Sequence, residues 1–432
     1  MELNYQIKPG GSLRGTIQIP GDKSISHRAI MLGAIAEGTT CINNFLSGKD
    51  CLATLNAFRT MGVNISQAAE NQIIINGVGL HGLQTPKKTI DLGNSGTSTR
   101  LLTGLLAGQN FNSCLTGDES LCKRPMARVT NPLRQMGAHI KLCDNNFPPI
   151  SISGTQNLQG IHYEMPIASA QVKSSLLLAG LYTKGETIIE EPEPSRDHTE
   201  RMLENFGCKI QRINNAIYLQ PPIKLNATNI NIPSDISSAA FFTVGASIAQ
   251  GSDILLPKIG INPTRTGVIT ILQKMGADIQ LLNQQIQSGE PIADIRVKSA
   301  VLQGIEIPTE LVSLAIDEFP IVFIAAACAK GRTILRGAAE LRVKESDRIQ
   351  TMAAGLIRLG IQVEVLADGI VIHGGILQGG EINSYGDHRV AMAFAMAALA
   401  TSDTIYIQNC VNVATSFPDF VAVARRAGLS IN

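Results

Sequence analysis

The segment Met275-Gly-Ala-Asp-Ile279 joins the end of a predicted helix to the start of a predicted strand, and close variants of it recur along the chain. In each copy an apolar residue is followed by glycine and then by an alternating apolar and polar run. Glycine readily ends a helix in the left-handed conformation, and alternation with a period of two is typical of a strand. The copies lie roughly 70 residues apart, which indicates a repeat architecture, and their glycines are Gly62, Gly137, Gly207, Gly276, Gly360 and Gly428.

A second series of apolar, alanine-rich segments alternates with the first. The segment VAMAFAMAAL at 390–399 has almost no polar face, and a helix that is apolar all round is a buried one. Each repeat is therefore predicted to consist of a strand, a buried helix, a strand, an amphipathic helix and two further strands. We expect an α/β fold built from six such βαβαββ repeats, whose buried helices end in turns that contain Gly38, Gly108, Gly185, Gly251, Gly331 and Ser402.

Six repeats can form one solenoid or two lobes of three. A strand at 16–20 comes directly before the first polar motif, and the third repeat ends near residue 233. We therefore expect a discontinuous lobe of residues 1–20 and 234–432 and a second lobe of residues 21–233. A cleft between lobes is a usual place for a ligand.

Composition excludes several classes of function. The 36 Lys and Arg residues balance 35 Asp and Glu, which leaves a net charge of +1 and disfavours a nucleic-acid partner. Aromatic residues make up 4% of the chain and Trp is absent, so stacking platforms for bases are not expected. The cysteines are scattered, and no apolar leader or run of about 20 apolar residues occurs. We expect a cytoplasmic protein that binds neither membranes nor nucleic acids.

The six buried helices begin with polar sequences. Their Ser, Asn and Asp residues are good N-caps, but capping does not explain several cations there, because a cation in the first turn opposes the helix dipole. Exposed N–H groups beside cations favour an anion site. We therefore favour anion binding over capping alone at GDKSISHR (21–28), GNSGTSTR (93–100), SAQVKS (169–174), SDISS (234–238), DEFP (317–320) and GDHR (386–389).

Three further polar clusters are predicted to open outer helices: 123–128, 195–200 and 344–348. Lys344 and Arg348 are four residues apart, and like charges at that spacing are unfavourable on a helix unless an anion lies between them. Pro125 suits the first helical position. Each cluster alone could instead be a solvent-exposed helix start with no ligand. Charged residues make up only 16% of the chain, so several such clusters together favour an anion site.

The sequence does not match other familiar binding or catalytic motifs in full. The sequence GVGLHG at 77–82 matches a dinucleotide-binding pattern, but Pro86 follows where a helix is required. The segment 21–24 lacks the glycine that precedes lysine in a P-loop. The histidines are too dispersed for a metal site, and Cys114 and Cys122 are better interpreted as inert cysteines than as nucleophiles.

Taken together and in order, the polar clusters resemble the enolpyruvyl transferases, specifically those that act on shikimate 3-phosphate. The segments KRPM (123–126), RDHTE (196–200), ELRVKESDR (340–348) and TSFPDF (415–420) add to those quoted above, so the resemblance spans the chain. It implies two lobes, each of three βαβαββ units with buried parallel helices. It also implies transfer of the enolpyruvyl group of phosphoenolpyruvate to the 5-hydroxyl of shikimate 3-phosphate, with release of phosphate through a tetrahedral adduct.

The resemblance also implies the site residues, the absence of a metal or organic cofactor, and a monomer. Asp317 is expected to accept the hydroxyl proton, Glu345 to act as acid and base at C3, and Lys23 to contact both substrates. The residues expected at shikimate 3-phosphate are Lys23, Ser24, Arg28, Ser169, Gln171, Arg196, Asp317 and Lys344. Those expected at phosphoenolpyruvate are Lys23, Gly96, Arg124, Gln171, Arg348 and Arg389, and closure of the lobes is expected to assemble the site.

Some residues depart from the commonest family pattern. Thr415 stands where many members have lysine, and Ser169 is followed by Ala170. Arg196 lies beside Ser195 in a segment where other members rely on serine. These features resemble a second subclass, some of whose members resist glyphosate, although Gly96 is retained.

Two alternatives stay open at this point. A UDP-N-acetylglucosamine enolpyruvyl transferase shares the fold, but that family has Lys-Asn in place of Lys23-Ser24. A repeat-built ring or scaffold is a different class, which the near-zero charge disfavours.

Overall fold

The computed structural model describes residues 3–144, 146–155 and 157–432. The α-helices are α1 (Lys23–Ile35), α2 (Lys49–Thr60), α3 (Gly96–Ala107), α4 (Glu119–Cys122), α5 (Ala127–Gln135), α6 (Ala170–Gly180), α7 (His198–Asn205), α8 (Ile236–Ile248), α9 (Gly267–Lys274), α10 (Phe319–Cys328), α11 (Arg348–Arg358), α12 (His388–Ala397) and α13 (Phe420–Ala427). Short 3₁₀ helices are η1 (Thr309–Leu311), η2 (Ser313–Ala315), η3 (Ala339–Val343), η4 (Ala398–Ala400) and η5 (Cys410–Thr415).

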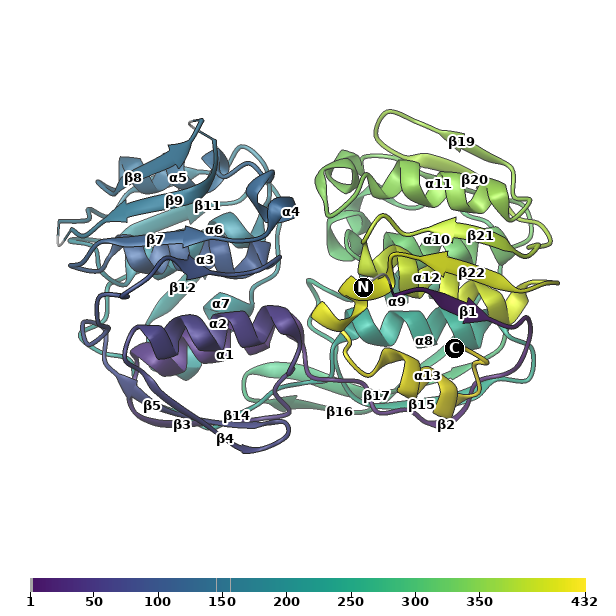
Figure 1. Cartoon of the computed structure of the whole chain (residues 1–432), viewed down its shortest axis with the longest axis horizontal. Helices are drawn as coiled ribbons and strands as arrows, with labels where there is room; N and C mark the ends of the chain where they lie inside the picture. The colour runs from purple at the N-terminus through teal and green to yellow at the C-terminus, as the bar shows by residue number, and fades with distance from the viewer. Residues whose placement is uncertain (1–2, 145, 156) are drawn as a thin grey trace. The chain divides into compact units, whose positions relative to one another are not determined.

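The strands lie between these helices in the predicted alternation (Figure 1). They are β1 (Tyr5–Ile7), β2 (Arg14–Thr16), β3 (Glu37–Asn43), β4 (Asn64–Ala69), β5 (Gln72–Val78), β6 (Ile90–Asp91), β7 (Ser113–Thr116), β8 (His139–Cys143), β9 (Phe147–Ser153), β10 (His162–Glu164), β11 (Thr187–Glu190), β12 (Ile210–Ile213), β13 (Ala216–Leu219), β14 (Ile230–Asn231), β15 (Asp253–Gly260), β16 (Asp278–Gln287), β17 (Glu290–Lys298), β18 (Arg332–Leu335), β19 (Val363–Val365), β20 (Ile370–His373), β21 (Gly380–Asn383) and β22 (Ile405–Gln408).

The chain divides into two compact units. Unit 1 comprises residues 1–20, 233–286 and 291–432, and unit 2 comprises residues 21–232 and 287–290. The short second segment of unit 2 is the turn of the hairpin formed by β16 and β17. Each unit holds three of the six repeats.

In unit 2 the three sheets have the same construction. Their strand orders are β14-β3-β5-β4, β6-β7-β9-β8 and β10-β11-β13-β12. In each sheet the first pair is parallel and the other two pairs are antiparallel. The parallel pair results because a buried helix connects its strands or the chain returns from a later repeat, whereas the antiparallel hairpins need only short turns.

In unit 1 the described strands form sheets in the orders β1-β22-β21, β16-β17-β15-β2 and β18-β20-β19. Strand β1 comes from the start of the chain and pairs with β22 near its end, from Tyr5 with Ile407 to Ile7 with Ile405. Strand β2 pairs with β15 in parallel. The first residues of the chain therefore complete two sheets of the unit that contains its last residues.

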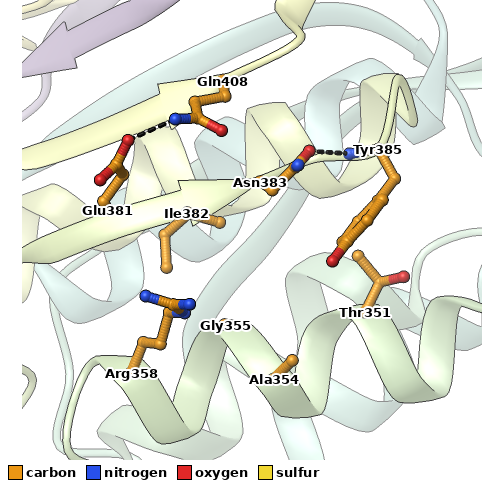
Figure 2. Close-up of a pocket in the computed structure, with 9 residues that line it drawn as sticks. All are labelled: Thr351, Ala354, Gly355, Arg358, Glu381, Ile382, Asn383, Tyr385 and Gln408. Carbon is orange, nitrogen blue, oxygen red and sulfur yellow. Dashed lines mark hydrogen bonds between the residues drawn. The ribbon is translucent and has the colours of Figure 1, made fainter.

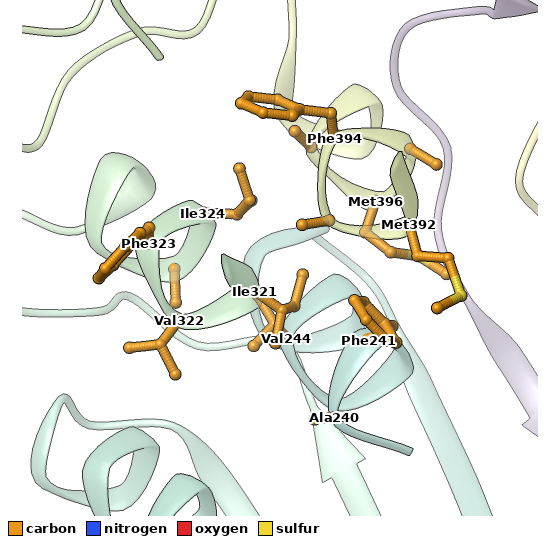
Figure 3. Packing of buried hydrophobic residues seen from close by; sticks show 14 of the residues in the cluster. Ala240, Phe241, Val244, Ile321, Val322, Phe323, Ile324, Met392, Phe394 and Met396 are labelled. Carbon is orange, nitrogen blue, oxygen red and sulfur yellow. The ribbon is translucent and has the colours of Figure 1, made fainter. Parts of the chain in front are cut away.

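The core of unit 1 lies among three nearly parallel helices, α8, α10 and α12 (Figure 1). Figure 3 shows buried side chains of the three helices, with Val244 from α8, Ile321 from α10 and Met392 from α12 toward the space between them. Every residue of α10 from Phe319 to Ala327 is buried, because this helix has sheets or helices on all sides. The predicted buried helices are confirmed.

In unit 2 the corresponding helices are α1, α3 and α6. Small residues let α3 and α6 approach closely: a Cβ atom on Gly104 of α3 would lie 2.0 Å from the backbone oxygen of Ser175 on α6. The helix ends also follow the prediction, because all six repeat glycines have a positive φ, between 84° and 118°. The α/β fold of six βαβαββ repeats, three in each unit, is thus confirmed.

The three polar clusters lie at the starts of helices as predicted, but Lys344 and Pro125 precede their helices instead of lying within them. Helix α11 begins at Arg348, because Asp347 is its N-cap and accepts a hydrogen bond from Gln350 N at 3.0 Å. Lys344 therefore lies before the helix, after η3. Helix α5 begins after Pro125, and α7 begins after Arg196. In the part of the chain that the structure describes, every helix lacks the combination of length and apolar character needed to span a membrane.

Candidate active site

The predicted site residues of unit 1 converge on one carboxylate. Asp317 Oδ1 lies 3.5 Å from Lys344 Nζ and 3.4 Å from Arg348 Nη1, and Asp317 Oδ2 lies 3.9 Å from Arg389 Nη2. Glu345 joins the same cluster through Arg348, with 2.6 Å between Oε2 and Nη2. All five residues predicted in this part of the chain therefore lie together.

Four separate elements bring these side chains to one place. Asp317 precedes α10, Lys344 follows η3, Arg348 is the first residue of α11, and Arg389 is the second residue of α12. Because α10, α11 and α12 pack against one another, the residues at and just before their starts bring two acidic and three basic side chains into a shared polar region.

Arg348 is the centre of this cluster and is 1% exposed. Its Nε donates to Asp387 Oδ2 at 2.9 Å, while its terminal nitrogens face Asp317 and Glu345. Burial alone would lower the pKa of Arg348, but Asp387, Glu345 and Asp317 outweigh burial and raise that pKa above its usual value. One buried guanidinium thus holds two predicted acid and base groups.

In unit 2 the predicted residue Arg28 of α1 points toward α6 and α7. Arg28 is 4% exposed, and it donates from Nε to Thr199 Oγ1 at 2.6 Å and from Nη2 to Ser174 Oγ at 2.8 Å. Burial lowers its pKa to about 10, and the neighbouring charge of Arg196 acts in the same direction. Arg28 therefore stays charged at neutral pH, with Arg196 close enough to act on it.

Lys23 and Ser24 form the first turn of α1. Lys23 Nζ lies 2.5 Å from Asp50 Oδ2 in α2, and Ser24 O accepts a hydrogen bond from Arg28 Nη1 at 2.9 Å. The side chain of Lys23 is 22% exposed, so it is held by Asp50 but not enclosed.

A second group of site residues lies at the start of α3. Arg124 Nη2 donates to Asn94 Oδ1 at 2.7 Å, and Arg100 Nη1 donates to Gln171 Oε1 at 2.7 Å. A Cβ atom on Gly96 would lie 3.0 Å from Arg100 Nη1 and 3.1 Å from Arg124 Nη1. Glycine therefore allows two guanidinium groups to approach the first N–H groups of α3, which is the arrangement that suits an anion.

Ser169 has a capping role in the structure. Its side chain is the N-cap of α6 and accepts a hydrogen bond from Val172 N at 3.4 Å. Capping side chains are also found at the starts of α1, α3, α8 and α12. Capping and anion binding are therefore compatible here, because an N-cap satisfies only part of the free N–H groups of a helix.

Lys173, in the same polar segment, is fully buried and is part of the internal structure. Its Nζ lies 2.9 Å from Glu191 Oε2 and 2.7 Å from Glu200 Oε1. Burial raises the pKa of Glu200, and Lys173 opposes that rise. This cation stabilises buried carboxylates behind Arg28.

Sequence reasoning missed several residues that position the site. Asp387 holds Arg348 and lies in the polar motif 386–389, which could have suggested it, whereas Asp50 holds Lys23 and lies outside the polar motifs. Arg100 was noted as a first-turn cation but was not included among the site residues. Arg265, which is buried near the starts of α8 and α10, gave no signal because it lies outside all the polar clusters.

Two other features contain none of the predicted site residues. A groove of about 250 Å³ lies between α11 and β21, with Arg358 and Glu381 among its lining residues (Figure 2). Among the described residues, His162, Glu164 and Glu190 place potential metal-ligating atoms within 4.8 Å of one another, but all three are exposed. Neither feature has a buried charged group comparable with Arg348.

Comparison with solved structures identifies the class of protein. The fold matches an enolpyruvyl transferase, NikO from Streptomyces tendae, with a TM-score of 0.80 over 99% of this chain and 98% of that chain, at 16% sequence identity. It also matches EPSP synthase from Acinetobacter baumannii with a TM-score of 0.91 and 56% identity, over 100% of this chain and 99% of that chain. The fold is therefore the enolpyruvyl transferase fold.

Sequence comparison defines the family within that class. The model of the family EPSP synthase (3-phosphoshikimate 1-carboxyvinyltransferase) matches residues 7–423. The 3-phosphoshikimate 1-carboxyvinyltransferase of Methylococcus capsulatus is 58% identical over 100% of this chain and 98% of the relative, and that of Nitrosococcus oceani is 59% identical over 99% and 97%. The chain belongs to the EPSP synthase family and is a transferase. These relatives do not favour the UDP-N-acetylglucosamine alternative.

Proposed function

We propose that the chain transfers the enolpyruvyl group of phosphoenolpyruvate to the 5-hydroxyl of shikimate 3-phosphate and releases phosphate. The observation that carries the proposal is that Asp317 and Glu345 both contact the buried guanidinium of Arg348. An addition to an enol phosphate followed by elimination needs one group for the hydroxyl proton and one for the proton at C3, and two carboxylates side by side supply both.

In the proposed reaction Asp317 takes the proton of the 5-hydroxyl while Glu345 gives a proton to C3 of phosphoenolpyruvate. The hydroxyl oxygen forms a bond to C2, which gives a tetrahedral adduct. In the second step C3 returns a proton to Glu345 and the double bond forms again. The bond between C2 and the phosphate oxygen breaks, and the proton held by Asp317 passes to the departing phosphate. Atoms and charges balance without a cofactor.

The cations are proposed to bind the anionic groups of the two substrates. We assign Lys23, Ser24, Arg28, Ser169, Gln171, Arg196 and Lys344 to shikimate 3-phosphate, and Lys23, Gly96, Arg124, Gln171, Arg348 and Arg389 to phosphoenolpyruvate. Guanidinium forks suit carboxylate and phosphate because they donate two parallel hydrogen bonds. Since Arg348 already faces three carboxylates, its contact with a substrate requires one of them to give way.

The decisive assay measures phosphate release from phosphoenolpyruvate with and without shikimate 3-phosphate. We expect release only with both substrates. Glu345→Gln should lower kcat by roughly 10²–10⁴-fold, the usual effect of removing a general acid or base, and Glu364→Gln on β19 is the matched control at an exposed position. Release that does not depend on shikimate 3-phosphate would contradict the proposed acceptor.

Two further variants test the other catalytic groups. Asp317→Ala should keep binding ligands of the phosphoenolpyruvate site but lose turnover, and Lys23→Met should lose turnover without unfolding. Lys123→Met is the control for Lys23→Met, because Lys123 pairs with Glu119 on an exposed surface. Near-normal turnover in either site variant would remove that residue from the mechanism.

The proposal requires residues of both units to act on the same substrates. We therefore propose that substrates induce closure, which small-angle scattering can measure as compaction when shikimate 3-phosphate and glyphosate are added together. Unchanged dimensions would count against closure. We further propose a cytoplasmic monomer, on the basis of the scattered cysteines and the family resemblance, and sedimentation analysis tests the monomer.

A further inference from the structure

Glu318, the residue after Asp317, is a carboxylate without a role in the mechanism above. It is 1% exposed. Its Oε1 accepts hydrogen bonds from Ser237 Oγ and from Arg389 Nη1, the latter at 3.4 Å. Its Oε2 has no hydrogen-bond partner among the residues that the structure describes. Burial of a carboxylate with one unsatisfied oxygen is costly, so this side chain calls for an explanation.

The start of helix α10 does not supply that explanation. Glu318 occupies the N-cap position, but its side chain makes no capping hydrogen bond, and Pro320 in the first turn already removes one of the free N–H groups. An apolar side chain at 318 would avoid the cost of burying a charge. The local structure of the helix therefore does not require a carboxylate here.

Buried polar groups form a chain of contacts that leads to Glu318. Ser237 Oγ, which donates to Glu318, accepts a hydrogen bond from Arg265 Nη2 at 2.6 Å. Arg265 is 3% exposed, and its Nη2 also lies 3.3 Å from Asp235 Oδ1. Acidic and basic groups thus alternate from Asp235 through Arg265 and Glu318 to Arg389, with Ser237 between the two middle charges.

This chain of contacts ends at the guanidinium of Arg389. Arg389 Nη1 donates to the backbone oxygen of Asp317 at 2.9 Å as well as to Glu318. Arg389 Nη2 lies 3.9 Å from Asp317 Oδ2. One terminal nitrogen is therefore fixed to the protein, while the other faces the carboxylate proposed as the base.

We propose that Glu318 is a positioning residue for Arg389. Its buried carboxylate fixes Nη1 so that the rest of the guanidinium faces the bound anion, and Ser237 and Arg265 keep Glu318 in that orientation. This inference rests on the proposed function, because it assigns the anion at Arg389 to phosphoenolpyruvate. Fixing a donor before the substrate arrives reduces the entropy that binding must overcome.

Glu318→Gln tests the proposal, because glutamine keeps the shape and an acceptor oxygen but removes the charge. We expect the KM for phosphoenolpyruvate to rise about tenfold, as for the loss of one charge-assisted hydrogen bond, while the KM for shikimate 3-phosphate stays within about twofold. Ser237→Ala should shift the same constant in the same direction by a smaller factor. Ser247→Ala is the matched control, because Ser247 is a buried serine of the same helix whose hydroxyl donates to the backbone oxygen of Thr243 at 2.8 Å.

The possible outcomes distinguish a failure of the positioning role of Glu318 from a failure of the proposed function. An unchanged KM for phosphoenolpyruvate in Glu318→Gln, or an equal rise in both KM values, would overturn the positioning role and leave the proposed function intact. A wild-type chain that releases no phosphate with both substrates would instead overturn the proposed function. If Glu318→Gln does not fold, Ser237→Ala against Ser247→Ala decides, and a wild-type KM in Ser237→Ala overturns the role.

Discussion

Arg348 and Asp387 form an ion pair that is almost completely withdrawn from solvent, with 2.9 Å between Nε and Oδ2 and side-chain exposures of 1% and 0%. The pair joins the first residue of α11 to the N-cap residue of α12. It therefore fixes the position from which Arg348 reaches Asp317 and Glu345. The geometry of the candidate site depends on this pair as much as on the residues expected to meet substrate.

Removal of the charge of Asp387 should destabilise unit 1. Asp387→Asn retains an oxygen that can accept the hydrogen bond from Arg389 N, so it separates the charge from the helix cap. Breaking a buried ion pair leaves the other charge uncompensated and typically costs roughly 3 to 5 kcal/mol. Urea unfolding at pH 7 measures the loss, and turnover should fall with it.

The control for this variant is Asp253→Asn. Asp253 pairs with Arg296 on an exposed surface, with side-chain exposures of 44% and 43%, and exposed pairs contribute little to stability. Equal unfolding midpoints for the two variants would show that the buried pair has no special role.

Lys173→Met should destabilise unit 2 without a direct effect on substrate contacts. The substitution leaves Glu191 and Glu200 buried without their shared cation, and we expect a loss of roughly 3 to 5 kcal/mol in the free energy of unfolding. The measurement is denaturant unfolding, with Lys123→Met as the exposed counterpart. A wild-type midpoint for Lys173→Met would contradict the structural role of Lys173.

His27 should make stability depend on pH. Burial, together with the charges of Lys23 and Arg28, lowers the pKa of His27 well below 6.5. In the folded state this histidine is neutral, whereas in the unfolded chain it takes up a proton as pH falls through about 6.5. Its contribution to stability is therefore complete above that pH and is lost below it, with a slope of at most about 1.4 kcal/mol per pH unit.

The test compares unfolding free energies between pH 8 and pH 5.5. His27→Asn should reduce the decline of stability at acidic pH relative to the wild type. The slope is compared and not the absolute stability, because the substitution also changes the contact of 2.8 Å between His27 Nδ1 and Thr54 Oγ1. His139→Asn, at an exposed position on β8, should keep the wild-type slope. An identical slope in all three proteins would refute the assignment.

Gly96→Ala should weaken the binding of phosphoenolpyruvate while the chain stays folded. The added Cβ would lie 3.0 Å from Arg100 Nη1 and 3.1 Å from Arg124 Nη1, and both contacts are with the far ends of flexible side chains, which can move. We expect the KM for phosphoenolpyruvate to rise by roughly tenfold, the factor for about one lost charged hydrogen bond, in steady-state kinetics.

Gly104→Ala on the same helix is the contrasting variant. Its Cβ would lie 2.0 Å from the backbone oxygen of Ser175, which cannot move aside without displacing α6. This variant should unfold at a lower denaturant concentration, since forcing volume into a packed core is destabilising. The prediction fails if Gly96→Ala loses stability as Gly104→Ala does and binds phosphoenolpyruvate normally.

The repeat and its buried helices could be predicted from the sequence because their signals are local. A glycine such as Gly276 ends a helix through its own backbone freedom, and a segment such as 390–399 has no polar face to expose. The candidate residues of unit 1 could also be proposed, because each lies in a polar cluster near a helix start, where exposed N–H groups favour anions.

The local sequence did not reveal which element holds each charge. Lys344 and Arg348 were predicted on one helix with an anion between them, but Asp347 caps α11 and leaves Lys344 outside it. The anion between the two cations is in part Asp317, a residue of the chain itself. The spacing between the two cations cannot show this, because the carboxylate lies 31 residues before Arg348, at the start of a different helix.

The amino-acid sequence alone determined the six repeats, the buried helices and the set of charged residues at their starts, since helix ends and hydrophobic periodicity depend on neighbours along the chain. Only the tertiary structure decided that Arg348 is buried against Asp387, that Lys173 is an internal cation, and that Glu318 supports Arg389. These relationships join residues that are far apart in sequence, and the free energy of a buried charge depends on which opposite charges the fold places around it.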